Sequence, residues 1–318
     1  MISDATLRHL REAADAPDLT GTKYEIVERI GQGGMGTVYR ARDRELMRDV
    51  ALKVVRLPEA SRDVAPRMVR EARTLARLEH PGIVPVHDVG TLPDGRVFYA
   101  MKLVRGAPLD ALPPATRAER LRIVERLCEA VAFAHAHGVV HRDLKPQNVM
   151  VGPFGEVLVM DWGVAKVTGE ADKSLGGADA TDDAPDTGHG VVLGTPGYMA
   201  PEQASGDGSR VDARADVYAV GAILRDLIQS GLQKGEQPAR PLRAIIQKAM
   251  AADPSARYAE TTVLARDVAA FRAGERVSAY RENVFEQTQR LISRYRTPIL
   301  LVLAYLVMRI ALVLISGR

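Results

Sequence analysis

The sequence predicts an α+β chain of two lobes, a small β-rich lobe followed by a larger helical lobe, with a transmembrane helix at the C-terminus. First, apolar and polar residues alternate along short segments within residues 24–104, which is the strand pattern. Second, apolar residues recur at helical spacing within residues 105–276. Third, residues 299–315 are apolar except for Arg309 and the amphipathic Tyr305. With 46% hydrophobic residues, the chain can bury a proper core.

The first lobe is expected to contain five strands and one helix. Residues 24–30 alternate apolar and polar side chains, and a glycine-rich turn follows them. Met68, Ala72 and Leu75 lie on one face at helical spacing, which predicts a helix over residues 66–78. The other strands are expected at residues 37–42, 50–56, 84–90 and 96–104.

The second lobe has the pattern of a set of helices. A long amphipathic pattern comes first, and three shorter ones follow. Polar motifs lie where the two lobes meet, which places a site in the cleft between them. The helices are expected at residues 117–137, 213–229, 242–251 and 262–273.

Charge and cysteine content narrow the function classes. The net charge of +3 is too small to indicate nucleic-acid binding, so no nucleic-acid partner is expected. The single cysteine, Cys128, cannot form an internal disulfide, which fits a reducing compartment. Because Cys128 lies in an apolar helical stretch, a small core residue is favoured over a redox switch.

Residues 141–148 read HRDLKPQN, and the triplet DWG follows at residues 161–163. A phosphoryl group in transfer carries dispersed negative charge. Catalysis therefore needs a group that orients the attacking hydroxyl, cations that neutralise charge, and oxygen ligands for magnesium. Asp143 is the candidate base, and Lys145 is the candidate cation beside the transferred phosphate. The candidate Mg²⁺ ligands are Asn148 and Asp161.

A glycine-rich run, GQGGMGTV, occupies residues 31–38. Glycine lets backbone N–H groups approach phosphates, but the run alone favours a plain glycine hairpin. Here it lies between two predicted strands rather than between a strand and a helix, which argues against a dinucleotide-binding turn and for a flap over phosphates. Lys53 lies on a strand otherwise built for burial. It is either a solvated edge lysine or a cation on the phosphates of a nucleotide.

Together these motifs resemble a protein kinase, specifically the bacterial serine/threonine kinases of eukaryotic type, over roughly residues 24–276. The resemblance implies ATP and Mg²⁺ as cofactors and serine or threonine hydroxyls of proteins as acceptors. It further implies that Glu71 holds Lys53 on the phosphates and that Met101 is the gatekeeper. The expected nucleotide-binding residues are Gly31, Gly33, Gly36, Val38, Ala51, Lys53, Glu71, Met101, Lys102 and Val104, with the backbone of the last two at the adenine edge.

The resemblance also assigns roles near the end of the catalytic region. Thr195 resembles the threonine that hydrogen-bonds the catalytic aspartate and lysine. Glu202 is expected to pair with Arg257, and Asp216 to hold the backbone of the catalytic loop. Trp162 replaces the phenylalanine that is usual in this triplet, and its indole N–H requires a hydrogen-bond partner.

Three functions remain open from the sequence. The leading one is an active, membrane-anchored serine/threonine protein kinase that also phosphorylates itself. The second is a pseudokinase or scaffold, which the complete set Lys53, Glu71, Asp143, Asn148 and Asp161 disfavours. The third is a small-molecule phosphotransferase, disfavoured by the run GTPGYMAPEQ, which positions a peptide hydroxyl. The sequence leaves open whether the chain forms a homodimer.

Two segments bear on regulation and docking. Residues 168–190 are poor in bulky apolar residues and are expected to be mobile. They either carry regulatory phosphosites clamped by Arg142, with candidates Thr181, Thr187 and Ser174, or form a solvated acidic insertion. Residues 230–241 form a shorter connection than related kinases usually carry, which predicts a departure in how protein substrates dock.

The C-terminal apolar run predicts a single-pass anchor in the cell membrane. A helix of this length spans about 26–28 Å, just short of a bilayer core of about 30 Å. Four arginines precede the run, so the kinase domain is expected in the cytoplasm: Arg281, Arg290, Arg294 and Arg296. The alternative is a buried or interfacial helix, because Arg309 opposes full insertion.

The expected organisation therefore has four parts. These are an N-terminal extension (residues 1–23), a kinase domain (residues 24–276, with lobes 24–104 and 105–276), a basic juxtamembrane segment (residues 277–297) and a transmembrane helix (residues 298–316).

Overall fold

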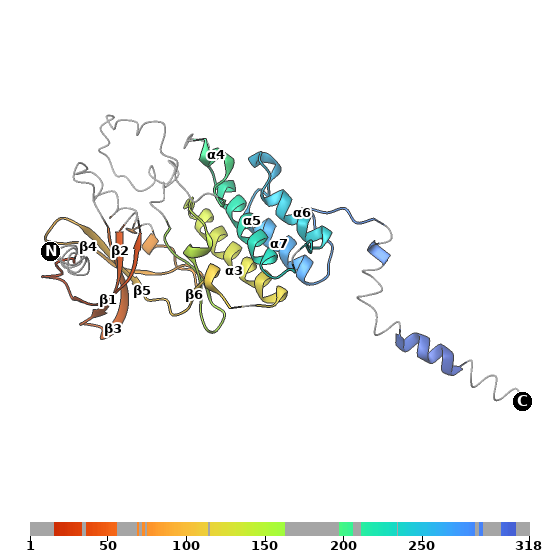
Figure 1. The fold of residues 1–318 in the computed structure, drawn as a ribbon, viewed down its shortest axis with the longest axis horizontal. Helices are drawn as coiled ribbons and strands as arrows, with labels where there is room; N and C mark the ends of the chain where they lie inside the picture. Colours follow the sequence, from red (N-terminus) through yellow and green to blue (C-terminus); the bar gives the residue numbers. More distant parts are fainter. Residues whose placement is uncertain are drawn as a thin grey trace, which may run out of the picture.

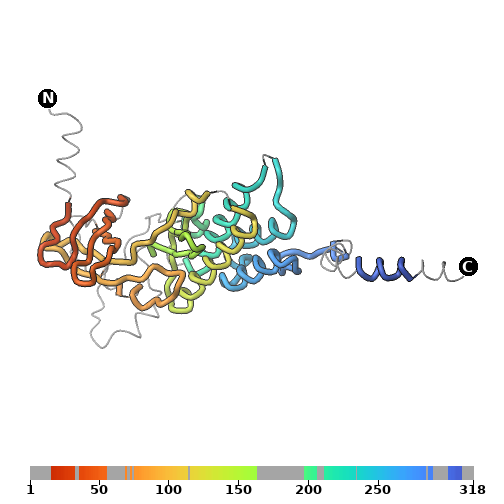
Figure 2. Tube along the Cα trace, turned by 90° about the horizontal axis from the view of Figure 1, so that it is seen from below, coloured from red at the N-terminus to blue at the C-terminus, as the bar shows by residue number. Residues whose placement is uncertain are grey.

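The structure is a computed structural model that describes residues 16–33, 36–55, 69, 72–73, 75–113, 115–162, 197–205, 211–233, 235–283, 286–288 and 300–309. Within these residues a five-stranded sheet is followed by a helical lobe that carries a small three-stranded sheet (Figure 1). Figure 2 shows from a second direction that the sheet and the helices occupy separate ends of the folded domain. The two-lobed α+β fold predicted from the sequence is confirmed.

The large sheet is antiparallel throughout, in the order β1-β2-β3-β5-β4. Its strands are β1 (Tyr24–Gly33), β2 (Gly36–Asp43), β3 (Arg48–Val55), β4 (Val86–Thr91) and β5 (Val97–Lys102). Four of them begin and end within two residues of a predicted strand, and β1 extends three residues beyond the predicted end, because alternation with a period of two is a strong signal over segments of this length.

Strand alternation divides the side chains of this sheet between two faces. On one face Leu52, Val54 and Phe98 belong to a cluster of buried apolar residues. On the other face β3 presents Ala51 and Lys53. The register places Val38 opposite Lys53 and Ala51 opposite Met101. Val38, Ala51 and Met101, which are among the residues expected to bind nucleotide, thus share the face that packs toward Leu158 of the helical lobe.

The helical lobe is built around one long central helix. Its elements are α3 (Arg117–Ala136), α4 (Pro201–Ala204), α5 (Arg214–Gln229), α6 (Arg240–Ala249) and α7 (Thr261–Arg272). Helix α3 begins with a capping box in which Thr116 and Glu119 satisfy each other's backbone N–H groups. It packs against α5 and α7 through fully buried side chains such as Val124, Leu127 and Leu264.

A small sheet lies between the two lobes. Its strands are β6 (Ala107–Pro108), β7 (Val149–Val151) and β8 (Val157–Val159), in the order β6-β7-β8. A parallel bridge joins Val159 to Ile83, just before β4. The sheet fixes the two ends of a hairpin that carries Asn148 before β7 and Asp161 after β8. Sequence patterns did not reveal it, because strands of two or three residues are shorter than the pattern needs.

The structure also bears on the helix predicted at residues 66–78, on the short connection at residues 230–241 and on the domain end predicted at residue 276. Residues 69, 72–73 and 75–76 are helical within the predicted helix 66–78, and Leu75 packs against the main core. The described residues between α5 and α6 contain no helix, as the short connection predicts. Residues 278 and 279 donate backbone N–H groups to Asp267 on α7, so chain beyond residue 276 still packs on the helical lobe.

Residues 300–309 are helical, and the large apolar side chains among them are exposed. None of the helices in the described ranges is both long and apolar enough to cross a bilayer. Much of the apolar run, including residues 310–316, lies outside those ranges.

Candidate active site

A buried carboxylate anchors the loop that carries the candidate base. Asp216, at the start of α5, accepts the backbone N–H groups of His141 at 2.8 Å and Arg142 at 2.9 Å. His135 Nε2 lies 2.7 Å from the same carboxylate. Burial alone would raise the pKa of Asp216, but the bonds from His135 and the His141 backbone outweigh it, and the pKa lies below its ordinary value. Asp216 therefore remains ionised and fixes the loop, as the sequence predicted.

His141 is wholly buried and orients the chain on both sides of it. Its Nδ1 accepts the backbone N–H of Asp143 at 3.3 Å, so the ring proton must be on Nε2, which donates to the Met160 carbonyl at 3.0 Å. Burial lowers the pKa of His141 against the opposing effect of nearby carboxylates such as Asp216. The neutral ring thus ties the Asp143 loop to the residue that precedes Asp161.

The candidate base and its cation are in direct contact. Lys145 Nζ lies 2.8 Å from Asp143 Oδ2. Asn148 Nδ2 donates to the Asp143 carbonyl at 2.8 Å, which leaves Oδ1 as the amide atom suited to a metal. Gln203 Nε2 donates to the Arg142 carbonyl at 2.8 Å and supports Arg142, whose φ of 65° is strained for a non-glycine residue. The loop is thus held in an otherwise unfavourable conformation.

Asp161 and Lys53 join the two lobes. Lys53 Nζ lies 2.5 Å from Asp161 Oδ1, and only 8% of the Lys53 residue is exposed. Burial opposes the charged form of Lys53, but Tyr99 and Asp161 outweigh it and raise the pKa. Lys53 is therefore a buried cation rather than a solvated edge lysine. Asp161 has a φ of 47°, a second strained position at the site.

Trp162 is accommodated within the helical lobe. Its residue is 6% exposed and belongs to the main apolar core. Its indole Nε1 donates to the Val159 carbonyl at 3.2 Å, which satisfies the N–H as the sequence analysis required. The ring centroid lies 4.9 Å from that of His141. The larger ring thus replaces the usual phenylalanine without loss of burial or hydrogen bonding.

An apolar cluster joins the sheet to the small hairpin below it. Its buried members are Ala51, Val84, Met101 and Leu158, and its half-buried members include Val38, Leu103, Val104, Met150 and Met160. Both lobes therefore contribute apolar walls, as expected for a site that holds a flat aromatic ring. The Lys102 N–H donates to the Pro85 carbonyl at 3.1 Å, so this N–H is engaged within the protein.

The packing around the β1–β2 turn requires glycine at some positions of the turn and not at others. A Cβ on Gly36 would lie 2.3 Å from the Val54 carbonyl oxygen, and its φ is +150°, so the hairpin itself requires glycine there. A Cβ on Gly31 would meet only the Val38 Cβ, at 3.8 Å. Packing does not require glycine at position 31, and its expected role at the phosphates stays a prediction. Gly33 closes β1 opposite Gly36.

Several predicted site residues lie outside the described residues. These are Glu71, Gly163, Thr195 and the candidate phosphosites Ser174, Thr181 and Thr187. Their expected roles stay predictions. The pair near the end of the domain is described: Arg257 Nη1 and Nη2 each lie 2.7 Å from a Glu202 carboxylate oxygen.

Sequence reasoning missed three supporting residues. His135 binds Asp216 from the long helix, Gln203 binds the Arg142 carbonyl, and Tyr99 lies with its ring centroid 5.8 Å from Lys53 Nζ. Each contact joins segments that are far apart in the chain, so no local sequence pattern predicts it. Strand alternation offered a signal only for Tyr99, which shares a face with Met101.

A known protein family matches most of this chain. The protein kinase domain family matches residues 24–251, the part of the chain that carries the candidate base, the candidate Mg²⁺ ligands and Lys53. This chain belongs to the protein kinase family. Its curated relatives are serine/threonine-protein kinases of bacteria.

Three relatives and one solved structure show the extent of the similarity. The kinase is 45% identical over 216 residues to the DNA damage-responsive serine/threonine-protein kinase RqkA of Deinococcus radiodurans, covering 65% of this chain and 30% of that protein. It is 44% identical over 217 residues to pkn3 of Myxococcus xanthus, covering 65% of this chain and 37% of that protein. It is 33% identical over 291 residues to PknB of Mycobacterium tuberculosis, covering 81% of this chain and 44% of that protein. The chain thus spans less than half the length of these relatives.

The kinase domain of Mycobacterium tuberculosis PknI is a structural neighbour with a TM-score of 0.57 and 28% identity. The match covers 80% of this chain and 98% of that one.

The donor set of the kinase fits Mg²⁺. Asp161 offers a carboxylate whose second oxygen is not engaged by Lys53, and Asn148 offers an amide oxygen. Met160 donates its N–H to the Asn148 carbonyl at 2.8 Å, so the two segments are adjacent. The described residues contain no group of three His, Cys, Asp or Glu side chains that could hold a metal. A pair of oxygen ligands completed by phosphates and water is the arrangement that Mg²⁺ favours.

Proposed function

We propose that this kinase transfers a phosphoryl group from ATP, with Mg²⁺, to serine and threonine hydroxyls of proteins, including its own. The observation that supports this most directly is the convergence of two cation–carboxylate pairs, Asp143 with Lys145 at 2.8 Å and Lys53 with Asp161 at 2.5 Å. One pair belongs to the loop that follows α3, and the other joins β3 to the end of β8. Such a site orients an acceptor and neutralises phosphate charge at the same time.

The residues divide the chemistry between the acceptor and the donor. The Asp143 carboxylate orients the attacking hydroxyl and accepts its proton. Lys145, held beside Asp143, stabilises negative charge on the transferred group. Lys53 positions the phosphates of ATP, and its pKa above the ordinary value keeps it cationic at neutral pH. Mg²⁺, held by Asn148 and Asp161, would supply the remaining neutralisation of phosphate charge.

The nucleotide site combines apolar walls with backbone groups. Val38, Ala51 and Met101 face the cleft from the sheet, and Leu158 faces it from the hairpin. Lys102 lies next to Met101 of this cluster, and its backbone carbonyl is the group that we expect to accept a hydrogen bond from an adenine amino group. The site therefore favours a purine nucleotide over a small phosphorylated metabolite.

Radiolabelled ATP tests the proposed activity. The full chain is incubated with [γ-³²P]ATP and Mg²⁺, and the products are separated and hydrolysed to identify the phosphorylated amino acids. Label on serine or threonine that requires Mg²⁺ supports the proposal. Nucleotide binding without any transfer to protein would favour the pseudokinase interpretation instead.

We also propose that residues 298–316 anchor the kinase in the cell membrane, with its catalytic domain in the cytoplasm. The apolar side chains of residues 300–307 are exposed rather than packed on the kinase domain, and this stretch is helical. Arginines concentrate before the run rather than after it. Arg309 costs about 2.5–3.5 kcal/mol near a bilayer centre, which several Leu, Ile and Val residues at about −0.3 to −0.6 kcal/mol each offset.

A further inference from the structure

A groove of about 740 Å³ lies on the helical lobe, outside the active site. We call it the α3 groove. It is bounded by the chain that follows β5, by one face of α3 and by the turn between β7 and β8. Its defining residues are Arg105, Leu112, Arg122, Ile123, Arg126 and Phe154. None of the residues assigned to ATP, Mg²⁺ or the acceptor lines it.

The groove is a built feature of the fold. A Cβ on Gly106 would lie 2.3 Å from the Val151 carbonyl oxygen, so the floor depends on the close approach of β6 to β7. Gly155 has a φ of +78° and completes the turn that carries Phe154. Arg126 on α3 donates a hydrogen bond to the Gly155 carbonyl and ties this turn to the helix.

The charge of the groove is strongly one-sided. Arg105, Arg122 and Arg126 are exposed at its rim. Arg122 and Arg126 are one helical turn apart and therefore share a face of α3. Glu119 is the only carboxylate among the lining residues, and both Thr116 groups, the backbone N–H and the hydroxyl, already bind it at 2.7 Å. Three guanidinium groups thus face a single, engaged carboxylate.

The groove also offers an apolar surface between these charges. Phe154 is 90% exposed at the tip of the β7–β8 turn, an unusual position for a large aromatic side chain. Leu112 and Ile123 lie below it in the same groove. Burial of Phe154 by a partner would recover about 25 cal/mol for each Å² of apolar surface removed from water. The groove therefore matches a ligand that is anionic along its length and apolar at its centre.

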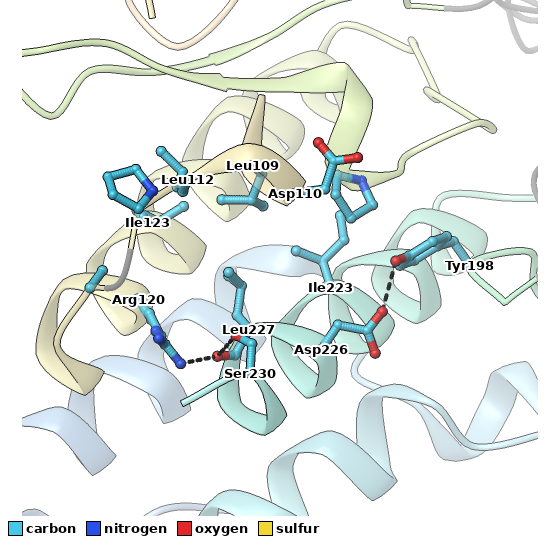
Figure 3. Close-up of a pocket in the computed structure, with 13 residues that line it drawn as sticks. Leu109, Asp110, Leu112, Arg120, Ile123, Tyr198, Ile223, Asp226, Leu227 and Ser230 are labelled. Atoms are coloured by element: carbon cyan, nitrogen blue, oxygen red, sulfur yellow. Dashed lines mark hydrogen bonds between the residues drawn. The ribbon is translucent and has the colours of Figure 1, made fainter. Parts of the chain in front are cut away.

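A second, smaller cavity continues the groove toward the catalytic loop. It has a volume of about 320 Å³ and shares Leu112 and Ile123 with the groove. At its far end lie Pro146 and Tyr198. Figure 3 shows the cavity walls, with Tyr198 bound to Asp226 and Arg120 bound to the Leu227 carbonyl.

We propose that the α3 groove binds an extended, acidic segment of a partner protein that carries an apolar side chain in its middle. Charge complementarity identifies the segment as acidic, and Phe154 with its neighbours identifies the apolar side chain. The concave shape argues for a peptide, because a lipid surface cannot enter a groove of this volume. Binding requires neither ATP nor Asp143, so the proposal is independent of catalysis.

The test measures binding to the full chain in nonionic detergent. The probe is a short fluorescein-labelled peptide that alternates glutamate with leucine, followed by fluorescence anisotropy. The double variant Arg105→Glu with Arg122→Glu is expected to weaken binding by about tenfold or more, and Phe154→Ser by about threefold to tenfold. Neither arginine makes a hydrogen bond to a described residue, so an unchanged circular dichroism spectrum and melting temperature are expected.

Matched controls distinguish binding in the α3 groove from a general effect of net charge or of any exposed apolar side chain. Arg243→Glu with Arg266→Glu makes the same charge change on exposed positions of α6 and α7. Leu46→Ser removes an apolar side chain that is 60% exposed on the β2–β3 turn. Both controls are expected to bind the peptide like the unmodified chain, and a version of the peptide with lysine in place of glutamate is expected not to bind.

Three results would overturn the proposal. The first is absence of measurable binding of the acidic peptide. The second is equal weakening by the control pair, which would mean a response to net charge alone. The third is binding of short-chain phosphatidylglycerol with the same arginine dependence while the peptide fails to bind, which would assign the groove to lipid headgroups.

Discussion

The backbone of Asp143 is held on both sides. The His141 ring accepts its N–H, and Asn148 donates to its carbonyl. The carboxylate contacts Lys145 at 2.8 Å, so a change of this side chain leaves the backbone hydrogen bonds of the loop in place. The backbone of Lys53 is also held in place, because its strand β3 pairs with β2 on one side and with β5 on the other.

Asp143→Asn is expected to lower autophosphorylation by about 10²–10⁴-fold, because the amide cannot accept the proton of the attacking hydroxyl. Nucleotide affinity is expected to change little, since Asp143 is not placed on the ATP phosphates. Radiolabel transfer measures the first quantity, and titration with a fluorescent ATP analogue measures the second. Full turnover in the variant would remove Asp143 from its proposed role.

Lys53→Met is expected to lower turnover by orders of magnitude with the fold preserved. Methionine fills the space of the aliphatic stem on β3, but it leaves Asp161 without its cation and ATP without its phosphate contact. Transfer of radiolabel is compared with the melting temperature in the same preparation. An unfolded variant would show that the Lys53–Asp161 pair is needed for structure rather than for phosphate positioning.

His141 predicts a loss of stability in mild acid. Burial holds its pKa below the ordinary value of 6.5, so the unfolded chain binds more protons as the pH falls below that value, and the folded state loses stability. His141→Asn removes the titrating group and should flatten this dependence. The melting temperatures of both chains are compared between about pH 7.5 and pH 5. Equal slopes for the two chains would contradict the prediction.

At the scale of elements, a buried ion pair joins α4 to the segment before α7. The Arg257 side chain is 0% exposed and the Glu202 side chain 9%. Arg257 also donates to the carbonyls of Ala251, Ala252 and Arg214. Helix α4 is thus fixed to the segment before α7.

Glu202→Ala is expected to destabilise the chain by about 3 kcal/mol, the lower end of the range for breaking a buried pair, because three carbonyls still bind Arg257. The matched control is Glu125→Ala, which removes a partially exposed pair with Arg272 at 2.7 Å and should cost about 1 kcal/mol or less. Denaturant unfolding measures the free energy of unfolding of both variants and of the unmodified chain. Costs of equal size would mean that burial does not distinguish the two pairs.

The elements differ in how well sequence alone predicts them. The five strands of the large sheet and the long helices carry enough periods of their pattern to be recognised. Strands β6, β7 and β8 do not, although they place Asn148 and Asp161. The functional motifs were recognised because their residues are contiguous, whereas His135 and Gln203 act across long sequence separations that no single-sequence pattern contains.

At the scale of the whole molecule, the proposed membrane anchor can be tested by cell fractionation. Full-length protein expressed in a bacterium is expected in the membrane fraction and to resist extraction with alkaline carbonate. A chain that ends at residue 297 is expected in the soluble fraction with its phosphotransfer retained. Recovery of the full chain in the soluble fraction, or its release by carbonate, would contradict the anchor and favour an interfacial helix.

Trp162 is the single tryptophan among the 318 residues, and it stands directly beside Asp161. Its indole is bonded to the Val159 carbonyl and lies against the His141 ring, two contacts on which its emission depends. The intrinsic fluorescence of the unlabelled protein therefore reports from one known place. Any rearrangement of Asp161 on occupancy of the cleft should shift the wavelength or yield of that emission. The tryptophan that stands in place of the usual phenylalanine thus provides a native spectroscopic probe of the site.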